Sequence, residues 1–331
     1  MKATMIILAV GLISGLLVNP ALAQGSPQAE HTLIDIAGYQ VPVVKDGLYD
    51  RFRSNTPLSV VEQESPQTDL SWFRTLEKSK ADVGFETYSP NFYYKNSRVS
   101  VIYTADIDRL RELVPEKVKE YVEPLQLWPG RGVVALTAYS YQYCDNDSYN
   151  EISLSIATNK PGNSNLGPIS LARRDRARDY WGYVLKLPVD SELARVRGIV
   201  GYNLPKWLTG ISYQENPESI TVEILDQETG EVDFVLEAAK LNDLTSELVM
   251  VTNGFTNINA QGDVTTGHAV FRQLKSGRST NSDDVNLKLT DGSFSRFIKS
   301  LQLGDMVRYD YVPDFQGALF APEPIASMLD D

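Results

Sequence analysis

The chain has 331 residues, 42% of them hydrophobic, and its 43 acidic and 31 basic side chains give a formal net charge of −12. This acidic balance argues against nucleic acid or an anionic membrane surface as a partner, because both repel a negatively charged protein. One cysteine cannot form a disulfide within the chain, and two histidines with one cysteine argue against a zinc or haem site, so we expect no metal and no cofactor.

The first 23 residues predict a secretory signal peptide. Lys2 precedes an apolar run from Met5 to Val18, and Ala21 and Ala23 form a small-x-small cleavage pattern. We expect cleavage near Ala23 and export to the periplasm or the extracellular space, with an uncleaved N-terminal anchor as the alternative. No later apolar stretch approaches the roughly 20 residues that span a bilayer, so we expect no membrane span in the mature chain.

Residues 24–94 predict an N-terminal extension that packs on a core domain at residues 95–331. The extension mixes short apolar pieces with turn residues, and one short helix is expected at residues 71–80. No recognisable site lies in it.

The core domain opens with a strand at Arg98–Tyr103 and a helix that starts at Thr104–Asp106 and ends at Pro115. Residues 132–143 then alternate as a long strand whose two faces both look partly buried. After a polar turn, residues 149–157 alternate again, which predicts an antiparallel hairpin over 132–157.

Glu151 in the second hairpin strand has two interpretations. It shares a face with Ser153 and Ser155, while Ile152 and Leu154 form the apolar face, so strand geometry alone favours a solvent-facing Glu151. The alternative is a face of small hydroxyl groups that borders a polar cavity inside a small barrel, where a carboxylate orients substrate or moves a proton.

The remaining sequence is mostly β. A charged segment from Ala172 to Asp179 indicates a helix face or a loop, and it leads into an aromatic strand predicted at residues 180–187. Further strands are expected at 220–225, 232–237, 247–252, 263–274, 286–289, 306–311 and 316–320, with a helix at 291–301. Short strands with regular turns predict an α+β protein, mainly antiparallel, whose sheet closes into a barrel with a few peripheral helices.

Lys206 stands out because it lies between Pro205 and Trp207 in an otherwise apolar stretch. Ammonium groups are strongly hydrated, so such a lysine either extends its stem along an aromatic face toward solvent or is buried. A buried lysine that loses its proton is a nucleophilic amine that condenses with a ketone or aldehyde to give a Schiff base.

Three segments together resemble the acetoacetate decarboxylase-like proteins. Arg98–Tyr103 followed by Asp106–Glu116 is similar to the family's first strand and helix, which end in Val-Pro-Glu. Tyr149–Glu151 is similar to its Tyr-x-Glu strand. Gly201–Tyr202 with Pro205–Trp207 is similar to its aromatic-Pro-Lys segment, which carries the Schiff-base lysine. The three occur in the family's order and approximate spacing, and the resemblance covers residues 95 to about 320.

The resemblance implies a β-cone with Lys206 as the buried Schiff-base residue and Glu151 as the matching acidic residue. We assign substrate-binding roles to Arg98, Tyr149, Tyr202 and Trp207. The implied reaction is decarboxylation of a keto acid or related carbonyl compound, which makes the chain a carbon–carbon lyase.

Several positions depart from the family pattern. Trp207 stands where the decarboxylases have a second lysine, and the strand near Ala135 lacks the family's glutamate. The family's arginine aligns with Asn96, and a two-residue shift brings Arg98 into its place. Asn203 and Leu204 are two extra residues before Pro205.

These departures keep three hypotheses open. The first is a Schiff-base enzyme, either a decarboxylase or an aldolase or dehydratase that uses the same lysine. The second is a non-catalytic periplasmic protein that binds an apolar carbonyl or lipid-like ligand. The third is a structural or partner-binding role in which the extension is the contact surface. A homo-oligomer is compatible with each of them.

Overall fold

Residues 30–329 are described by a computed structural model. The predicted signal peptide lies outside these residues. Within them, the helices are too short or too polar to cross a bilayer.

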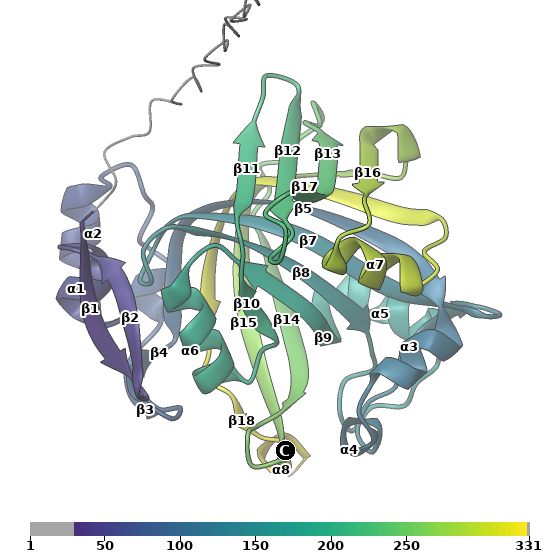
Figure 1. Ribbon diagram of the computed structural model, residues 1–331, viewed down its shortest axis with the longest axis horizontal. Coiled ribbons are helices and arrows are strands. Elements are labelled where there is room, and N and C mark those ends of the chain that lie inside the picture. The colour runs from purple at the N-terminus through teal and green to yellow at the C-terminus, as the bar shows by residue number, and fades with distance from the viewer. Residues whose placement is uncertain (1–29, 330–331) are drawn as a thin grey trace, which may run out of the picture. The chain divides into compact units, whose positions relative to one another are not determined.

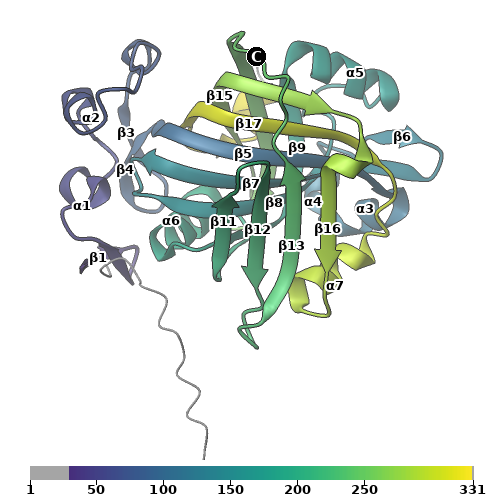
Figure 2. The same ribbon diagram turned by 90° about the horizontal axis from the view of Figure 1, so that it is seen from above.

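Seven strands of the described chain pair into a closed barrel (Figures 1 and 2). In their order around the barrel they are β5 (Asn91–Asp106), β7 (Arg131–Cys144), β8 (Tyr149–Ala157), β9 (Asp179–Val189), β14 (Val249–Ile258), β15 (Val264–Ser279) and β17 (Met306–Leu319). Strand β17 pairs with β5 and closes the ring. The closed sheet and the 132–157 hairpin are confirmed.

The barrel is mixed and not purely antiparallel. Strand β14 runs parallel to one end of β9, and the short β10 (Lys206–Leu208) runs parallel to its other end. Short strands β6 (Gln126–Trp128) and β18 (Glu323–Pro324) extend the barrel at β7 and β15. The expected strands at 306–311 and 316–320 are one strand, β17.

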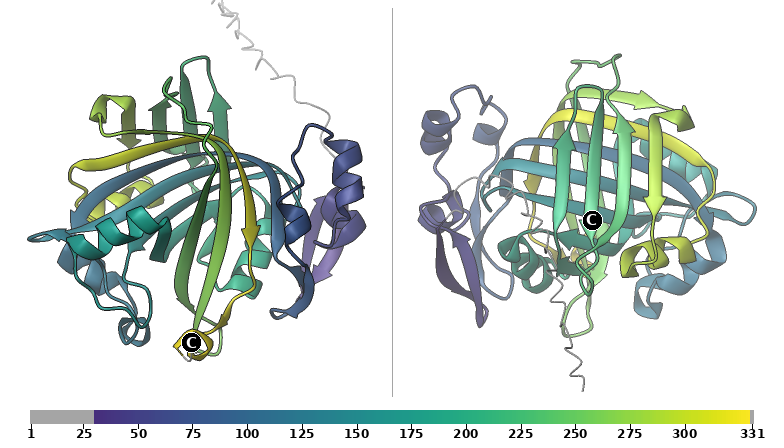
Figure 3. Two further views of the ribbon diagram at one scale, coloured as in Figure 1. Left: turned by 180° about the vertical axis from the view of Figure 1, so that it is seen from behind. Right: turned by 45° about the horizontal axis from the view of Figure 1, so that its top comes forward.

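A second sheet covers the outer face of the barrel. It contains β11 (Ile211–Glu215), β12 (Ser219–Leu225), β13 (Val232–Ala239) and β16 (Val285–Leu289), and helix α7 (Ser293–Ser300) packs beside it (Figure 3, right). Val222 and Phe234 belong to one buried cluster with Val101, Leu136 and Leu154 of the barrel. Since this sheet buries the outward side chains, both faces of β7 and β8 are shielded from water.

Helices close the ends of the barrel. They are α3 (Ile107–Leu113), α4 (Glu116–Lys119), α5 (Pro168–Ala177), α6 (Glu192–Tyr202) and α8 (Ala326–Leu329), with a 3₁₀ turn at Ser282–Asp284. Helix α3 was predicted, and Asp106 caps it by accepting from the backbone N–H of Arg109. Helix α6 was not predicted, because its β-branched residues and two glycines have low helix propensity.

The N-terminal extension contains β1 (His31–Ile36), β2 (Tyr39–Val44), α1 (Leu48–Phe52), α2 (Leu58–Glu64), a 3₁₀ turn (Phe73–Thr75), β3 (Ser79–Asp82) and β4 (Glu86–Ser89). The helix expected at 71–80 is wrong, since only the 3₁₀ turn forms there before β3 begins. Val61 and Phe73 pack on Phe92 and Tyr94, which belong to β5. The expected boundary at residue 94 therefore falls within a barrel strand.

The extension also braces α6. Val41 and Tyr49 pack against Leu193 and Val196 of the helix. The guanidinium of Arg197, only 1% exposed, donates to Tyr49 Oη at 3.1 Å and to Thr87 Oγ1 at 3.2 Å. These contacts fix the helix that precedes β10.

Phe234→Ala tests the support that the outer sheet gives to the barrel. Phe234 is fully buried and lies 5.7 Å from the ring of Phe294. Because the change removes a large core side chain, we expect it to lower the free energy of unfolding by about 3–5 kcal/mol. Urea titration measures the loss. Val232→Ala, on the same strand at a residue 40% exposed, is the matched control and should stay within about 0.5 kcal/mol.

Candidate active site

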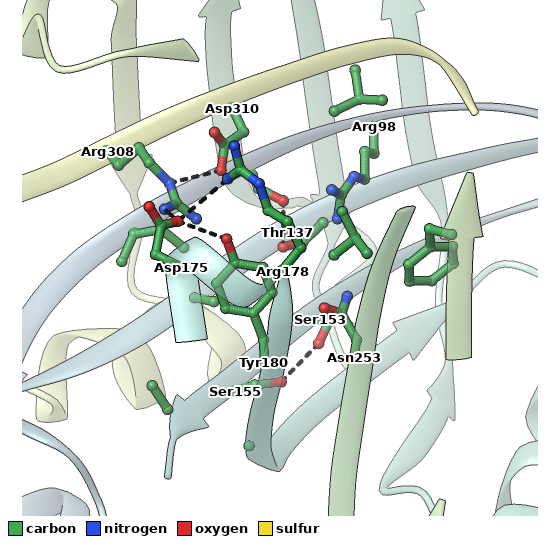
Figure 4. Close-up of a pocket in the computed structure, with 18 of the residues that line it drawn as sticks. Arg98, Thr137, Ser153, Ser155, Asp175, Arg178, Tyr180, Asn253, Arg308 and Asp310 are labelled. Carbon is green, nitrogen blue, oxygen red and sulfur yellow. Dashed lines mark hydrogen bonds and ion pairs between the residues drawn. The ribbon is translucent and has the colours of Figure 1, made fainter. Parts of the chain in front are cut away.

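The barrel encloses a cavity of about 890 Å³. Side chains from all seven barrel strands line it, together with residues of α5 and with Lys206 of β10 (Figure 4). The sequence alternation explains this lining, because every second residue of β5, β7 and β8 points inward while the residues between them enter the outer core.

Strand register sets one row of side chains across the cavity wall. Val312 of β17 pairs with Arg98 of β5, Arg98 pairs with Tyr139 of β7, and Tyr139 pairs with Glu151 of β8. Directly opposed residues of antiparallel strands point to the same face. We call these four residues the site row. It places Arg98 and Glu151 on one wall with the Tyr139 phenol between them.

The end of α6 positions Lys206 beside this row. Asn203 adopts a left-handed conformation (φ 55°), and its N–H donates to the carbonyl of Gly198, as does that of Leu204. The chain reverses there and enters β10, where Lys206 pairs with the cavity-lining Leu187. The aliphatic stem of Lys206 crosses Gly198 so closely that a Cβ at that position would collide with it. Asn203 and Leu204, the extra residues, form this reversal.

Lys206 and Glu151 form a buried ion pair. The ammonium Nζ lies 2.6 Å from Glu151 Oε2, and the two side chains are 7% and 9% exposed. The other carboxylate oxygen, Oε1, accepts from the hydroxyl of Tyr141 at 3.3 Å. A short charge-assisted hydrogen bond of this kind is a direct path for a proton between amine and carboxylate.

Three buried tyrosines back this pair. Tyr93 and Tyr149 share a hydrogen bond of 3.2 Å, and the ring of Tyr141 lies 4.7 Å from that of Tyr149. Burial raises the pKa of all three phenols well above the ordinary value, so they stay uncharged at neutral pH. Lys206 Nζ lies 5.6 Å from the ring centre of Tyr149, which gives the ammonium a cation–π contact.

Arg98 brings a second buried cation into the cavity. Its guanidinium lies beside two adjacent aromatic rings, 5.7 Å from the centre of Phe271 and 5.9 Å from that of Phe315, and the residue is 7% exposed. Its Nε has no hydrogen-bond partner, and among residues 30–329 Arg98 forms no ion pair with a carboxylate. A buried guanidinium without an anion is suited to bind a carboxylate in a bidentate fork.

The structure brings three of the six predicted site residues to the cavity, namely Lys206, Glu151 and Arg98. The solvent-facing interpretation of Glu151 is wrong, because the barrel closes around the hydroxyl-bearing face of β8. Asn96, the position aligned without gaps to the family arginine, instead donates to the backbone oxygens of Tyr93 and Phe315. The strand pairing is irregular on either side of Asn96.

The other three predicted site residues, Tyr149, Tyr202 and Trp207, do not line the cavity. Tyr149 lies behind the ion pair, and Tyr202 packs behind the wall with Val184 and Leu187. Trp207 faces the outer core, 5.6 Å from the ring of Phe294, since adjacent strand residues point to opposite faces. Sequence reasoning missed Tyr139 and Tyr141, although both shared the alternating face of residues 133–143.

Ion pairs tie α5 to the barrel strands at one end of the cavity (Figure 4). Asp175 of α5 accepts from Tyr180 Oη at 2.7 Å and from Arg308 Nη1 at 2.5 Å, and it also pairs with Arg278. Burial alone raises the pKa of Asp175, but the hydrogen bond from Tyr180 and the charges of Arg308 and Arg278 outweigh burial and bring the pKa to about 2. These contacts hold α5 against β9, β15 and β17.

Metal-ligand clusters are absent from the part of the chain that the structure describes. His268 stacks on Phe320 with ring centres 4.6 Å apart, and burial lowers the pKa of its imidazole. Cys144 is fully buried and unpaired.

Fold and site define a closed mixed β-barrel with a lysine–carboxylate pair buried at its wall. The chain is similar to an acetoacetate decarboxylase from Legionella pneumophila, at 12% identity over 71% of this chain and 86% of that one, with a TM-score of 0.52. It is also similar to the enduracididine biosynthesis enzyme MppR with HEPES buffer bound, at 12% identity over 72% and 88%, with a TM-score of 0.50. The acetoacetate decarboxylase-like fold implied by the sequence is therefore confirmed.

No family model matches the sequence, and no curated protein matches it.

Asp175→Asn tests the closure of the cavity by α5. The change removes the charge that holds Arg278 and Arg308, so we expect hydrogen exchange of the α5 amides to rise at pH 7. Because the folded-state pKa of Asp175 is lowered to about 2, its ion pairs persist above the ordinary carboxyl value near 4 and are lost as the pH falls through about 2. The difference from wild type should vanish there.

Arg176→Gln is the control for this measurement, since Arg176 lies exposed on the same helix. Equal exchange in Asp175→Asn and wild type at pH 7 would show that packing alone holds α5.

Proposed function

We propose that this protein is an enzyme that condenses the Lys206 amine with the ketone of a keto acid and decarboxylates the resulting Schiff base. One observation carries the proposal. A buried lysine, its carboxylate partner and a buried arginine without an anion face one cavity inside the barrel.

The reaction begins with proton transfer from the Lys206 ammonium to Glu151 across their 2.6 Å contact. The neutral amine then attacks the ketone carbon, forming the carbon–nitrogen bond of a carbinolamine. Glu151 returns this proton to the oxygen, then takes a second proton from the carbinolamine nitrogen and passes it to the hydroxyl group. The hydroxyl leaves as water with the electrons of the carbon–oxygen bond, and an iminium remains. Tyr141 keeps the carboxylate oriented through its hydrogen bond to Oε1.

Arg98 selects the carboxylate of the substrate. Before substrate binds, Lys206 and Arg98 carry two positive charges against the single negative charge of Glu151. Burial of unpaired charge is costly, so a ligand that brings one carboxylate is favoured over a neutral ketone. The planar guanidinium, packed against the adjacent rings of Phe271 and Phe315, also fixes the direction of the carboxylate.

Decarboxylation follows because the iminium accepts electrons. The bond between the α carbon and the carboxylate breaks, carbon dioxide leaves, and the electron pair forms an enamine that neutralises the nitrogen. Protonation of the enamine carbon regenerates an iminium, and water then releases the ketone product and restores the amine. The shared fold with an acetoacetate decarboxylase is compatible with this reaction. The aldolase and dehydratase alternatives would use the same iminium.

We further propose that the enzyme acts after export. The support is the charged start, apolar run and Ala-x-Ala pattern of residues 1–23.

Reductive trapping tests the Schiff base. We expect wild-type protein incubated with acetoacetate and longer 3-keto acids, then reduced with borohydride, to gain one adduct that peptide mapping places at Lys206. Lys206→Met keeps the apolar stem over Gly198 but lacks the amine, so it should give no adduct at this position. Lys186→Met, on the neighbouring strand β9 and outside the cavity lining, is the matched control and should react as wild type does.

Two other outcomes of this experiment would contradict the proposal. Saturable binding of the keto acids without an adduct would leave a non-catalytic pocket. Adducts spread over surface lysines would contradict the assignment to Lys206.

Glu151→Gln tests the proton transfer. The amide cannot accept a proton from Lys206, so we expect carbon dioxide release to fall about 10²- to 10⁴-fold, as for loss of a general acid–base residue. The measurement is single-turnover release of carbon dioxide. Since one partner of a buried ion pair is lost, circular dichroism of this variant and of Lys206→Met/Glu151→Gln checks folding. Unchanged turnover in folded Glu151→Gln would refute the role.

A further inference from the structure

A second row of side chains lies directly beside the site row. Ser100 of β5 pairs with Thr137 of β7, and Thr137 pairs with Ser153 of β8. Each residue is two positions from its strand's member of the site row, which is about 7 Å along a strand. We call these three residues the hydroxyl row. Figure 4 shows Thr137 and Ser153 facing the cavity with Ser155 next to them.

The hydroxyl row keeps hydrogen-bonding capacity for a ligand. Ser100 and Thr137 share one hydrogen bond of 2.8 Å, and Ser153 and Ser155 share another of 2.9 Å. Each pair uses one of its two hydroxyl hydrogens, so each keeps one donor and several lone pairs. Ser100 and Thr137 are 5% and 6% exposed, which shields them from bulk water.

The opposite wall is mainly apolar. Strands β14 and β15 lie three pairings from β7 in either direction around the barrel, and they present Val251, Phe271 and Ala269. Asn253 and Gln273 interrupt this wall. An occupant of this space therefore meets hydroxyl groups along one side and mainly apolar side chains along the other, with the charged side chains of Arg278, Arg308 and Asp310 toward α5.

The cavity is also large for a short keto acid. Its volume of about 890 Å³ lies near the upper end of the range of about 300–1,000 Å³ found for sites of drug-sized ligands. With a ketone at Lys206 and a carboxylate at Arg98, a four-carbon acid leaves the space between the site row and α5 unfilled.

We propose that the substrate is an extended 3-keto acid whose chain carries hydroxyl or keto oxygens beyond the ketone, bound along the hydroxyl row. This inference rests on the proposed function, because Lys206 and Arg98 define where the ketone and the carboxylate lie. The chain then runs toward α5 with its oxygens on Thr137 and Ser153 and its hydrocarbon edge against Val251 and Phe271.

The test compares 5,7-dihydroxy-3-oxooctanoate with 3-oxooctanoate, which has the same chain length without the two hydroxyl groups. The readouts are kcat/KM for carbon dioxide release and the borohydride adduct at Lys206. We expect the wild-type protein to favour the dihydroxy acid by about tenfold for each hydrogen bond formed. Thr137→Val/Ser153→Ala should reduce that preference by about tenfold or more, because it removes two hydroxyl partners without adding bulk.

Thr252→Val is the matched control. Thr252 lies on barrel strand β14 but does not line the cavity, so this variant should keep the wild-type preference.

The outcomes separate the two proposals. If both acids give the Lys206 adduct and the same kcat/KM in wild type, the extended oxygenated substrate is refuted while the Schiff-base function stands. The same holds if the double variant lowers both values equally. If neither acid gives an adduct, the Schiff-base function fails and this inference fails with it.

Discussion

The buried contact between Lys206 and Glu151 is the constraint on which the rest of the structure depends. Two opposite charges at 2.6 Å, with less than a tenth of each side chain exposed, require surrounding elements that shield them from bulk water. The closed barrel supplies the inner wall, and the second sheet with α7 seals the outer one. Helix α6, braced by Arg197 and the N-terminal extension, holds the lysine in place.

Strand register gives the site its precision. Arg98, Tyr139 and Glu151 stand on three neighbouring strands, and backbone hydrogen bonds fix their relative positions. A slip of one residue would turn all three side chains into the outer core, where Val99, Ala138 and Ile152 now lie. Sites carried on strands in this way are more rigid than sites on loops. Lys206 is not part of the site row. It reaches the site through the turn at Asn203.

The local alternation of apolar and polar residues could predict the strands, but it could not predict which face of each strand lines the interior of the barrel. The hairpin at 132–157 and the special position of Lys206 followed from alternation and composition alone. Glu151 looked exposed, because its neighbours Ser153 and Ser155 are as typical of a solvated face as of a polar cavity. The answer depends on closure through pairs distant in sequence, such as Val312 with Arg98, which no local pattern contains. Helix α6 was missed for another reason. Gly198 weakens the helical pattern of the sequence, and this glycine is needed because the stem of Lys206 passes close to it, not because the helix requires it.

In the proposed reaction, the charges of the site also predict how the product would be released. With a keto acid bound, the carboxylate offsets the excess positive charge of Arg98 and Lys206 over Glu151. Loss of carbon dioxide removes that carboxylate, and the ketone left behind has no group to pair with the guanidinium. Since Arg98 lies beside Phe271 and Phe315 without another anion, the proposed reaction predicts weaker binding of the product than of the substrate. The same unpaired arginine that we propose selects the acid would therefore also favour exchange of product for the next substrate.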